Sequence, residues 1–123
     1  MSTSANSELG RRGEDEAARL LTARGYRILA RNYRTRRGEV DIVAADGDAI
    51  VFVEVKTRAG AGFGAPAAAV DARKMRRMTL ASRAFLALHG LEDRPARFDV
   101  VSVEIRDGRT RCELIKNAFD APD

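Results

Sequence analysis

Apolar residues recur along this chain at two different spacings, and the first spacing is helical. From about Leu9 to Arg24 they stand three and four positions apart, and Gly25 follows as a residue that commonly ends a helix. They are Ala17, Ala18, Leu20 and Leu21. Glu14 precedes several of them at helical intervals, so we predict that it lies on the inward face of this helix.

The second spacing is that of β-strands, which the pattern predicts at 26–33, 39–45, 49–57, 97–105 and 112–119. Asp46-Gly47 separates the second run from the third, and Asp107-Gly108 separates the last two. An Asp-Gly pair between two β-rich runs is typical of a hairpin, so two hairpins are predicted. The run at 97–105 is apolar on both faces, as expected of a central strand.

A second helix is predicted from Asp71, which can cap it, to His89, with Gly90 ending it. Its inward stripe is Met75, Met78, Ser82, Phe85 and Leu86. A glycine-rich loop, Ala59 to Pro66, precedes it. The order α-β-β-β-α-β-β predicts a mixed α/β fold with a central mixed sheet flanked by helices. We expect one domain over 1–123, with 1–7 and 117–123 as flexible tails.

Charged residues interrupt the first predicted hairpin, although its strands are otherwise built of Val, Ile and Phe. They are Glu39, Asp41, Glu54 and Lys56. Side chains alternate between the two faces of a strand, so Glu39, Asp41 and Val43 are predicted to share one face of the run at 39–45. Glu54 and Lys56 are predicted to share one face of the run at 49–57. If Asp46-Gly47 is the loop, Glu39 opposes Glu54 and Asp41 lies on the diagonal. If Gly47-Asp48 is the loop, Asp41 opposes Glu54 directly.

Both registers bring carboxylates together, and opposed like charges destabilise a sheet. Such a pair needs a bound cation or a large shift in pKa. Mg²⁺ is the simplest answer, with Mn²⁺ as a substitute, because it takes few carboxylates and leaves room for phosphate oxygens. Lys56 can then orient the attacking group and offset negative charge on a phosphate. The alternatives are an ordinary cross-strand ion pair for Glu54 and Lys56, and a backbone hydrogen bond for Asp41.

The formal charge of +4 and a sequence pI near 9.8 favour an anionic partner, with nucleic acid ahead of a membrane surface. Cys112 is the one cysteine, and the polar N-terminal residues resemble no export signal, so we expect a cytoplasmic protein. The longest apolar run, AIVFVEV, is too short to cross a bilayer. Phosphate contacts are predicted for Arg34, Arg36, Arg37, Arg58 and Lys74; the alternative is that these are simply solvated surface charges.

Five stretches together resemble the YraN-like family of small bacterial proteins: GRRGEDEAARLL, GEVDIVA, FVEVKTR, GFGAP and the helix that carries Lys74. Asp41 followed by Glu54-Val55-Lys56 is similar to the PD-(D/E)xK signature of the restriction-endonuclease-like superfamily, with Val40 in place of its proline. Superfamily relatives that include the archaeal Holliday junction resolvases carry an acidic residue on the first helix as well. The resemblance implies catalytic roles for Glu14, Asp41, Glu54 and Lys56, with the three acids as metal ligands.

The function expected from these observations is hydrolysis of phosphodiester bonds in DNA by a Mg²⁺-dependent endonuclease. The resemblance to junction resolvases favours branched or junction DNA, on which a homodimer would present two sites. The alternative is a non-catalytic nucleic-acid-binding module whose acidic cluster is a structural cation site. A third hypothesis is a protein-interaction adaptor that has no measurable affinity for DNA.

Overall fold

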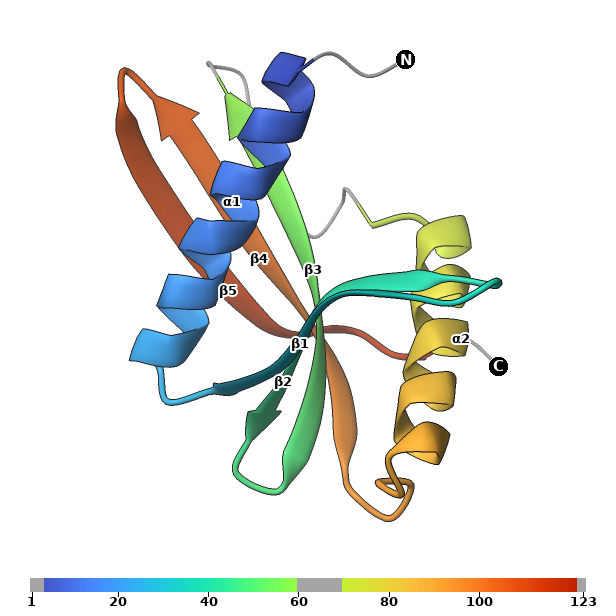
Figure 1. Ribbon diagram of the computed structural model, residues 1–123. Coiled ribbons are helices and arrows are strands. Elements are labelled where there is room, and N and C mark those ends of the chain that lie inside the picture. The colour runs from blue at the N-terminus through green and yellow to red at the C-terminus, as the bar shows by residue number, and fades with distance from the viewer. Residues whose placement is uncertain (1–3, 60–69, 122–123) are drawn as a thin grey trace.

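The computed structural model describes residues 4–59 and 70–121, which form two helices and five strands (Figure 1). In chain order these are α1 (Ser4–Ala23), β1 (Arg27–Arg34), β2 (Glu39–Asp46), β3 (Ala49–Ala59), α2 (Ala72–Leu88), β4 (Ala96–Arg106) and β5 (Arg109–Phe119). The predicted order of elements is confirmed. The glycine-rich loop expected at Ala59 to Pro66 lies, from residue 60 onward, outside the described residues.

The five strands form one sheet in the order β1-β2-β3-β4-β5. Only the pairing of β3 with β4 is parallel among the described strands. A parallel pair needs a crossover, and α2 lies between these two strands in the sequence. The helices cover opposite faces of the sheet (Figure 1). The predicted mixed α/β fold with a flanked central sheet is therefore confirmed.

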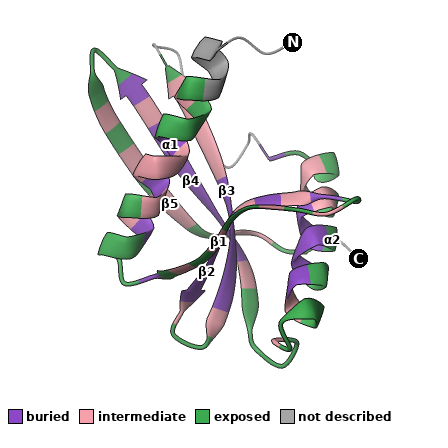
Figure 2. Cartoon of the chain, viewed as in Figure 1, coloured by how far each residue is buried: buried purple, intermediate pink, exposed green. Residues whose placement is uncertain are grey.

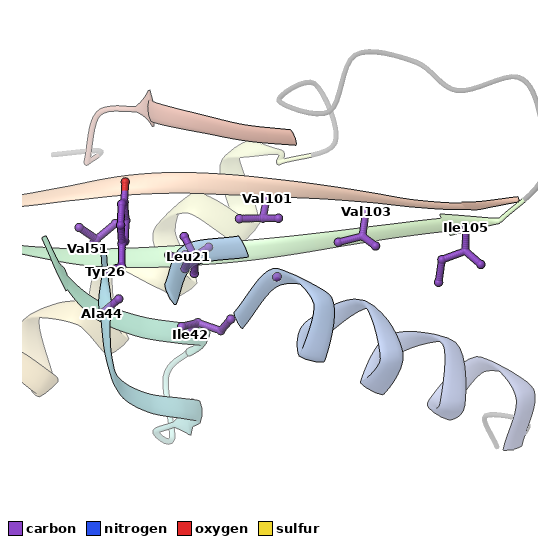
Figure 3. Close-up of a cluster of buried hydrophobic side chains, with 10 residues drawn as sticks. Leu21, Tyr26, Ile42, Ala44, Val51, Val101, Val103 and Ile105 are labelled. Carbon is purple, nitrogen blue, oxygen red and sulfur yellow. The ribbon is translucent and has the colours of Figure 1, made fainter. Parts of the chain in front are cut away.

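The α1 side of the sheet holds one hydrophobic core, shown in Figure 3. Ala17 and Leu21 of α1 are fully buried there, against side chains of the central strands such as Val53 and Val103. α1 approaches β3 closely at Gly13, where an added Cβ would collide with the side chain of Thr57. The sheet and helix meet at this point because glycine has no side chain.

α1 begins at Ser4, earlier than the predicted start near Leu9. Residues 4–8 contain no Gly or Pro that would stop a helix, and extending an existing helix costs little. The segment predicted as an N-terminal tail is therefore helical from residue 4 onward. Within the described part of the chain, neither helix is long and apolar enough to span a membrane.

The α2 side holds a second core, in which Met78, Ala81 and Phe85 pack on Phe52 and other residues of the sheet. As predicted, the Asp71 side chain caps α2 by accepting a hydrogen bond from the backbone N–H of Lys74 at 2.8 Å. Ser82 is buried as predicted, and its hydroxyl donates to the Met78 carbonyl at 2.7 Å. Met75, predicted on the inward stripe, is only half-buried.

The turn between β2 and β3 is Gly47-Asp48, because Asp46 pairs directly with Ala49. This is the second of the two registers considered above. The pairing continues to Ile42 opposite Val53, so the next positions along the strands are Asp41 and Glu54. The turn alone therefore decides that these two carboxylates meet.

β5 runs to Phe119, three residues into the segment predicted as a flexible tail from residue 117. The Phe119 ring stacks on Phe98 of β4 at a centroid distance of 4.8 Å, which holds the strand end against the sheet. Burial is concentrated in β3 and β4, the central strands, as Figure 2 shows. The centrality predicted for the 97–105 run is confirmed.

A buried charged network joins β4 to Tyr26, just before β1, and to Asp46, at the end of β2. Asp99 is fully buried, and its carboxylate accepts hydrogen bonds from Tyr26 Oη at 3.0 Å and from Arg97 Nε at 3.1 Å. Arg97 also donates to Asp46 Oδ2 at 2.8 Å. The backbone N–H of Asn117 is a further donor to Asp99. The buried charge is thus paired and hydrogen-bonded, as a stable fold requires.

Candidate active site

Asp41 lies where the regular alternation of β2 breaks. Strict alternation would place Val43 and Asp41 on one face and Val40 on the other, but Val40 and Val43 both pack in the α2-side core. On β1, Asn32 has a positive φ of 54°, a conformation that Asn tolerates better than most residues. Val40 therefore departs from the predicted alternation, while Asp41 lies beside Glu54, whose carboxylate faces Lys74 of α2.

The Asp41 side chain completes the pairing of β2 with β3. Its Oδ2 accepts a hydrogen bond from the backbone N–H of Val55 at 2.8 Å, just beyond the last backbone pair, Ile42 with Val53. This contact is the backbone hydrogen bond considered as the alternative for Asp41. The same hydrogen bond holds the Asp41 carboxylate beside Glu54. Asp41 therefore supports the strand pairing and takes part in the carboxylate pair at the same time.

Glu54 is a buried carboxylate whose side chain is only 4% exposed. Its Oε1 has no hydrogen-bond partner, the one such buried side-chain atom in the described residues. Lys56 Nζ lies 3.4 Å from Oε2, and Lys74 Nζ lies 3.5 Å from Oε1. Burial first and the Asp41 carboxylate second raise the pKa of Glu54 to about 7, although Lys74 and Lys56 act in the opposite direction. A buried acid with so perturbed a pKa is typical of functional sites.

Lys74 and Glu39 extend this cluster towards α2. Lys74 Nζ lies 3.8 Å from Glu39 Oε1, and Arg77 Nη2 lies 3.6 Å from the same oxygen. Gly38, which precedes Glu39, contacts α2 so closely that a Cβ would collide with the Arg77 carbonyl. The tip of the β1–β2 hairpin therefore rests on the first turns of α2 (Figure 1).

Glu14 does not join the carboxylate pair. Its Oε1 accepts hydrogen bonds from Arg31 Nε at 3.0 Å and Asn32 Nδ2 at 2.9 Å, both on β1. Within residues 4–59 and 70–121, no three His, Cys, Asp or Glu side chains are grouped to hold a metal ion. The ladder places Asn32 opposite Asp41, between the pairs Arg31–Ile42 and Tyr33–Val40. Glu14 is thus connected to the site through Asn32, which lies opposite Asp41. As its spacing on the helix predicted, Glu14 lies on the inward face of α1.

The basic residues predicted to bind nucleic acid fall in two places. Arg34, Arg36 and Arg37 are exposed at the tip of the β1–β2 hairpin, above α2. Arg58 lies two residues beyond Lys56 on β3 and is half-buried. Lys74 is different, since it contacts Glu54 and Glu39 within the site.

Sequence reasoning missed two arginines on β5 that share this face of the sheet. Arg58 pairs with Glu104 on β4, and Glu104 pairs with Arg111 on β5, so the three lie in one row across the sheet. Arg109 lies two residues along the same strand, and both arginines are exposed. They line an open groove of about 650 Å³ at the β4–β5 turn. Their alternate spacing was visible in the sequence, but their relation to Lys56 depends on the parallel register of β3 with β4.

Comparison with known proteins shows similarity over nearly the whole chain. A family model described as uncharacterised protein family UPF0102 matches residues 13–103, which include the candidate site. A UPF0102 protein of Symbiobacterium thermophilum is 55% identical over 92% of this chain and 97% of its own length. One from Geobacter sulfurreducens is 51% identical over 94% and 91%, and one from Rhodococcus jostii is 49% identical over 93% and 98%.

Proposed function

This chain belongs to family UPF0102, the YraN-like proteins, and from its pairing of Asp41 with the buried Glu54 we propose that it is a metal-dependent nuclease that hydrolyses DNA. Membership confirms the family expected from the sequence, while the activity is our proposal. The observation that carries it is Glu54: a buried carboxylate beside Asp41, with one oxygen that has no hydrogen bond and Lys56 at the other. A structural ion pair accounts for the Lys56 contact, but it does not account for a buried oxygen without a hydrogen bond.

The donor atoms fit a hard divalent cation such as Mg²⁺ or Mn²⁺. Both side chains offer carboxylate oxygens, the donors that these ions prefer, and Glu54 Oε1 is buried without a hydrogen bond. Asp41 and Glu54 would hold the ion. When bound, it would supply positive charge that polarises a phosphate oxygen. The remaining coordination positions would be taken by water and phosphate, since Glu14 does not join the two acids.

The protein groups around the pair have separable roles in this proposal. Lys56, whose side chain is 30% exposed, can hold a water molecule for attack and offset the charge that develops on the phosphate. Glu14 acts as a positioning residue, because it fixes Asn32 opposite Asp41. Arg58 on β3 and Arg109 and Arg111 on β5 place positive charge on either side of Glu104, where they would contact DNA phosphates. Arg34, Arg36 and Arg37 would do the same at the hairpin tip.

Branched DNA and a twofold dimer remain part of the proposal. A small chain with one site cuts two strands of a junction most simply when two copies act together. The test is whether a four-way junction is bound and cut in preference to duplex, with the mass of the complex measured by analytical ultracentrifugation.

A binding module without catalysis is the second candidate, and one observation favours it. Asp41 Oδ2 serves a backbone hydrogen bond and Glu14 is engaged by Arg31 and Asn32, so no group of three acids is assembled among the described side chains. In that case the pair would be a structural cation site. The basic surface would still bind nucleic acid.

The deciding experiment is cleavage of labelled single-stranded, duplex, flap and four-way-junction DNA in Mg²⁺ and Mn²⁺. We would compare wild type with Lys56→Ala and Asp41→Asn, and use Lys116→Ala as a control, because Lys116 lies near Asp46 and Tyr26 instead of the site. Metal-dependent cleavage should fall by about a hundredfold or more in the first two variants only. Cleavage retained in both would remove the nuclease proposal, and binding without cleavage would favour the binding module.

A further inference from the structure

Lys74 occupies a specific place beside the carboxylate pair, and its position is set by the start of α2. Its backbone N–H donates to the capping Asp71 side chain at 2.8 Å, which fixes the first helical turn. From there its Nζ reaches to 3.5 Å from Glu54 Oε1, the buried oxygen that has no hydrogen bond. The ammonium is thus near this oxygen without pairing fully with it.

The same ammonium has a second carboxylate within reach. Nζ lies 3.8 Å from Glu39 Oε1, and the Glu39 side chain is 37% exposed while that of Lys74 is 24% exposed. A lysine side chain has a flexible stem and a compact charge, so it can move between two acceptors without displacing the helix. Lys74 is therefore shared between Glu54, inside the site, and Glu39, at its rim.

We propose that Lys74 competes with the divalent cation for Glu54 Oε1 and moves to Glu39 when the cation binds. This inference rests on the proposed function, since it concerns the same cation site. Two positive charges within about 4 Å repel strongly in a partly buried environment. A cation at Oε1 therefore excludes Lys74 from its present position. Glu39 stabilises the displaced ammonium, which then stands at the rim where a phosphate would enter.

Removing the competing charge should tighten binding of the cation. We would titrate the full-length protein with Mn²⁺ alone, at pH 7.5, by isothermal titration calorimetry. Lys74→Met should bind Mn²⁺ roughly tenfold more tightly than wild type, because a neighbouring like charge is lost. Cleavage should nevertheless decrease, since the same ammonium no longer faces the substrate.

Arg77→Met is the matched control. It removes the same charge from the same helix, one turn further on, and Arg77 contacts Glu39 without contacting Glu54 in the ion pairs of the described residues. Its effect on Mn²⁺ affinity should stay below about threefold, as expected for a more distant, screened charge. Circular dichroism would confirm that both variants are folded.

A double-mutant cycle with Glu39→Gln tests the second position of Lys74. In the wild-type background this change should weaken Mn²⁺ binding, because Lys74 loses its alternative partner and stays at Glu54. In the Lys74→Met background the same change should have a clearly smaller effect. Equal effects in the two backgrounds would mean that Glu39 acts only as a nearby negative charge. This result would overturn the proposed movement of Lys74 to Glu39.

Unchanged or weaker Mn²⁺ binding in Lys74→Met would overturn the competition. If wild type still shows metal-dependent cleavage in that case, the nuclease proposal survives and only the role of Lys74 falls. If wild type binds no Mn²⁺ and cuts no DNA, both fall. Tighter binding in Lys74→Met, with Arg77→Met unchanged, supports the competition whether or not the protein proves to be a nuclease.

Discussion

Asp41 accepts a hydrogen bond from the backbone N–H of Val55 at 2.8 Å, and this contact holds its carboxylate beside that of Glu54. One oxygen of Asp41 thereby replaces a backbone acceptor at the point where β2 leaves β3. The strand bend and the carboxylate pair are thus one feature of the structure. Burial of Glu54 and, second to it, the Asp41 carboxylate raise the pKa of Glu54 to about 7.

The first prediction concerns the stability of the metal-free protein. The pKa of Glu54 rises from 4.5 to about 7 on folding, mainly through burial and then through Asp41. Between these two values the folded state binds a proton that the unfolded chain has released, so stability falls as pH rises through this window. Below about pH 4.5 this loss is absent. Glu54→Gln should have a flatter profile and be more stable than wild type at pH 8 by about 1–3 kcal/mol.

Urea unfolding in EDTA between pH 4 and pH 8 would measure this profile. Glu113→Gln is a suitable control, because Glu113 is an exposed acid on β5. Parallel profiles for wild type and Glu54→Gln would show that Glu54 titrates normally and would remove the argument from its pKa.

The second prediction concerns the close approach of α1 to β3. Gly13→Ala places a Cβ against the Thr57 side chain, whereas Gly10→Ala, on the same helix, meets nothing within 4 Å. Both changes raise helix propensity equally, so their difference isolates the contact. Gly13→Ala should be less stable than Gly10→Ala by about 1–3 kcal/mol, measured by urea unfolding. Equal stabilities would mean that α1 can move away from β3 at little cost.

The third prediction concerns Tyr26, whose hydroxyl is held between Asp99 and Arg97. Burial and the Asp99 carboxylate raise the pKa of Tyr26 from 10.0 to about 12. The contribution of the protonated Tyr26 hydroxyl to the stability of the fold is therefore complete below about pH 10, and it is lost as the pH rises towards 12. Tyr26→Phe should lower stability at pH 8 by about 1–2 kcal/mol, because Asp99 loses a donor, and should flatten the alkaline decline.

Guanidinium unfolding at pH 8 to 11 would follow that decline. Tyr33→Phe is the comparison, since Tyr33 contributes a ring to the α2-side core. An alkaline decline that persists unchanged in Tyr26→Phe would assign it to another group.

The fourth prediction concerns the β5 arginines. If Arg109 and Arg111 contact phosphates, replacing both by Gln should weaken DNA binding and lower the slope of log affinity against log salt by about 2. Fluorescence anisotropy from 50 to 300 mM salt would measure this slope. Replacing Arg19 of α1 and Arg24, which directly follows that helix, is the matched control and should change the slope little, because α1 lies on the opposite side of the sheet. An equal loss in both pairs would indicate a general charge effect.

Much of the architecture could be predicted from local patterns. The Asp71 cap, the Gly25 and Gly90 stops and the two hairpin turns lie where the sequence predicted them, because caps and turns depend on a few adjacent residues. The first turn is Gly47-Asp48, one of the two registers that the sequence left open. The pattern also predicted a strand ending at Phe119, where β5 ends, but it missed the start of α1 at Ser4. The stacking of Phe119 on Phe98 is a contact between strands that no local pattern reveals.

In the candidate site, too, local patterns were predicted correctly while contacts between distant residues were not. Alternation along β3 correctly grouped Glu54 with Lys56, since that strand is regular. Alternation failed at Val40, which packs in the α2-side core together with Val43. Lys74 was predicted from charge alone as a nucleic-acid contact. Its position 3.5 Å from Glu54 became visible only with α2 docked on the sheet.

By itself the sequence determined which chemical groups are present, the order of the elements and the short hairpin that brings Asp41 to Glu54. These depend on interactions between residues close in the chain. Only the tertiary structure decided that Glu54 is buried with one oxygen unpaired, that Glu14 is engaged by Arg31 and Asn32, and that Lys74 is shared between two acids. Burial and long-range ion pairs depend on how α1 and α2 dock on opposite faces of the sheet, and that docking is set by the whole core.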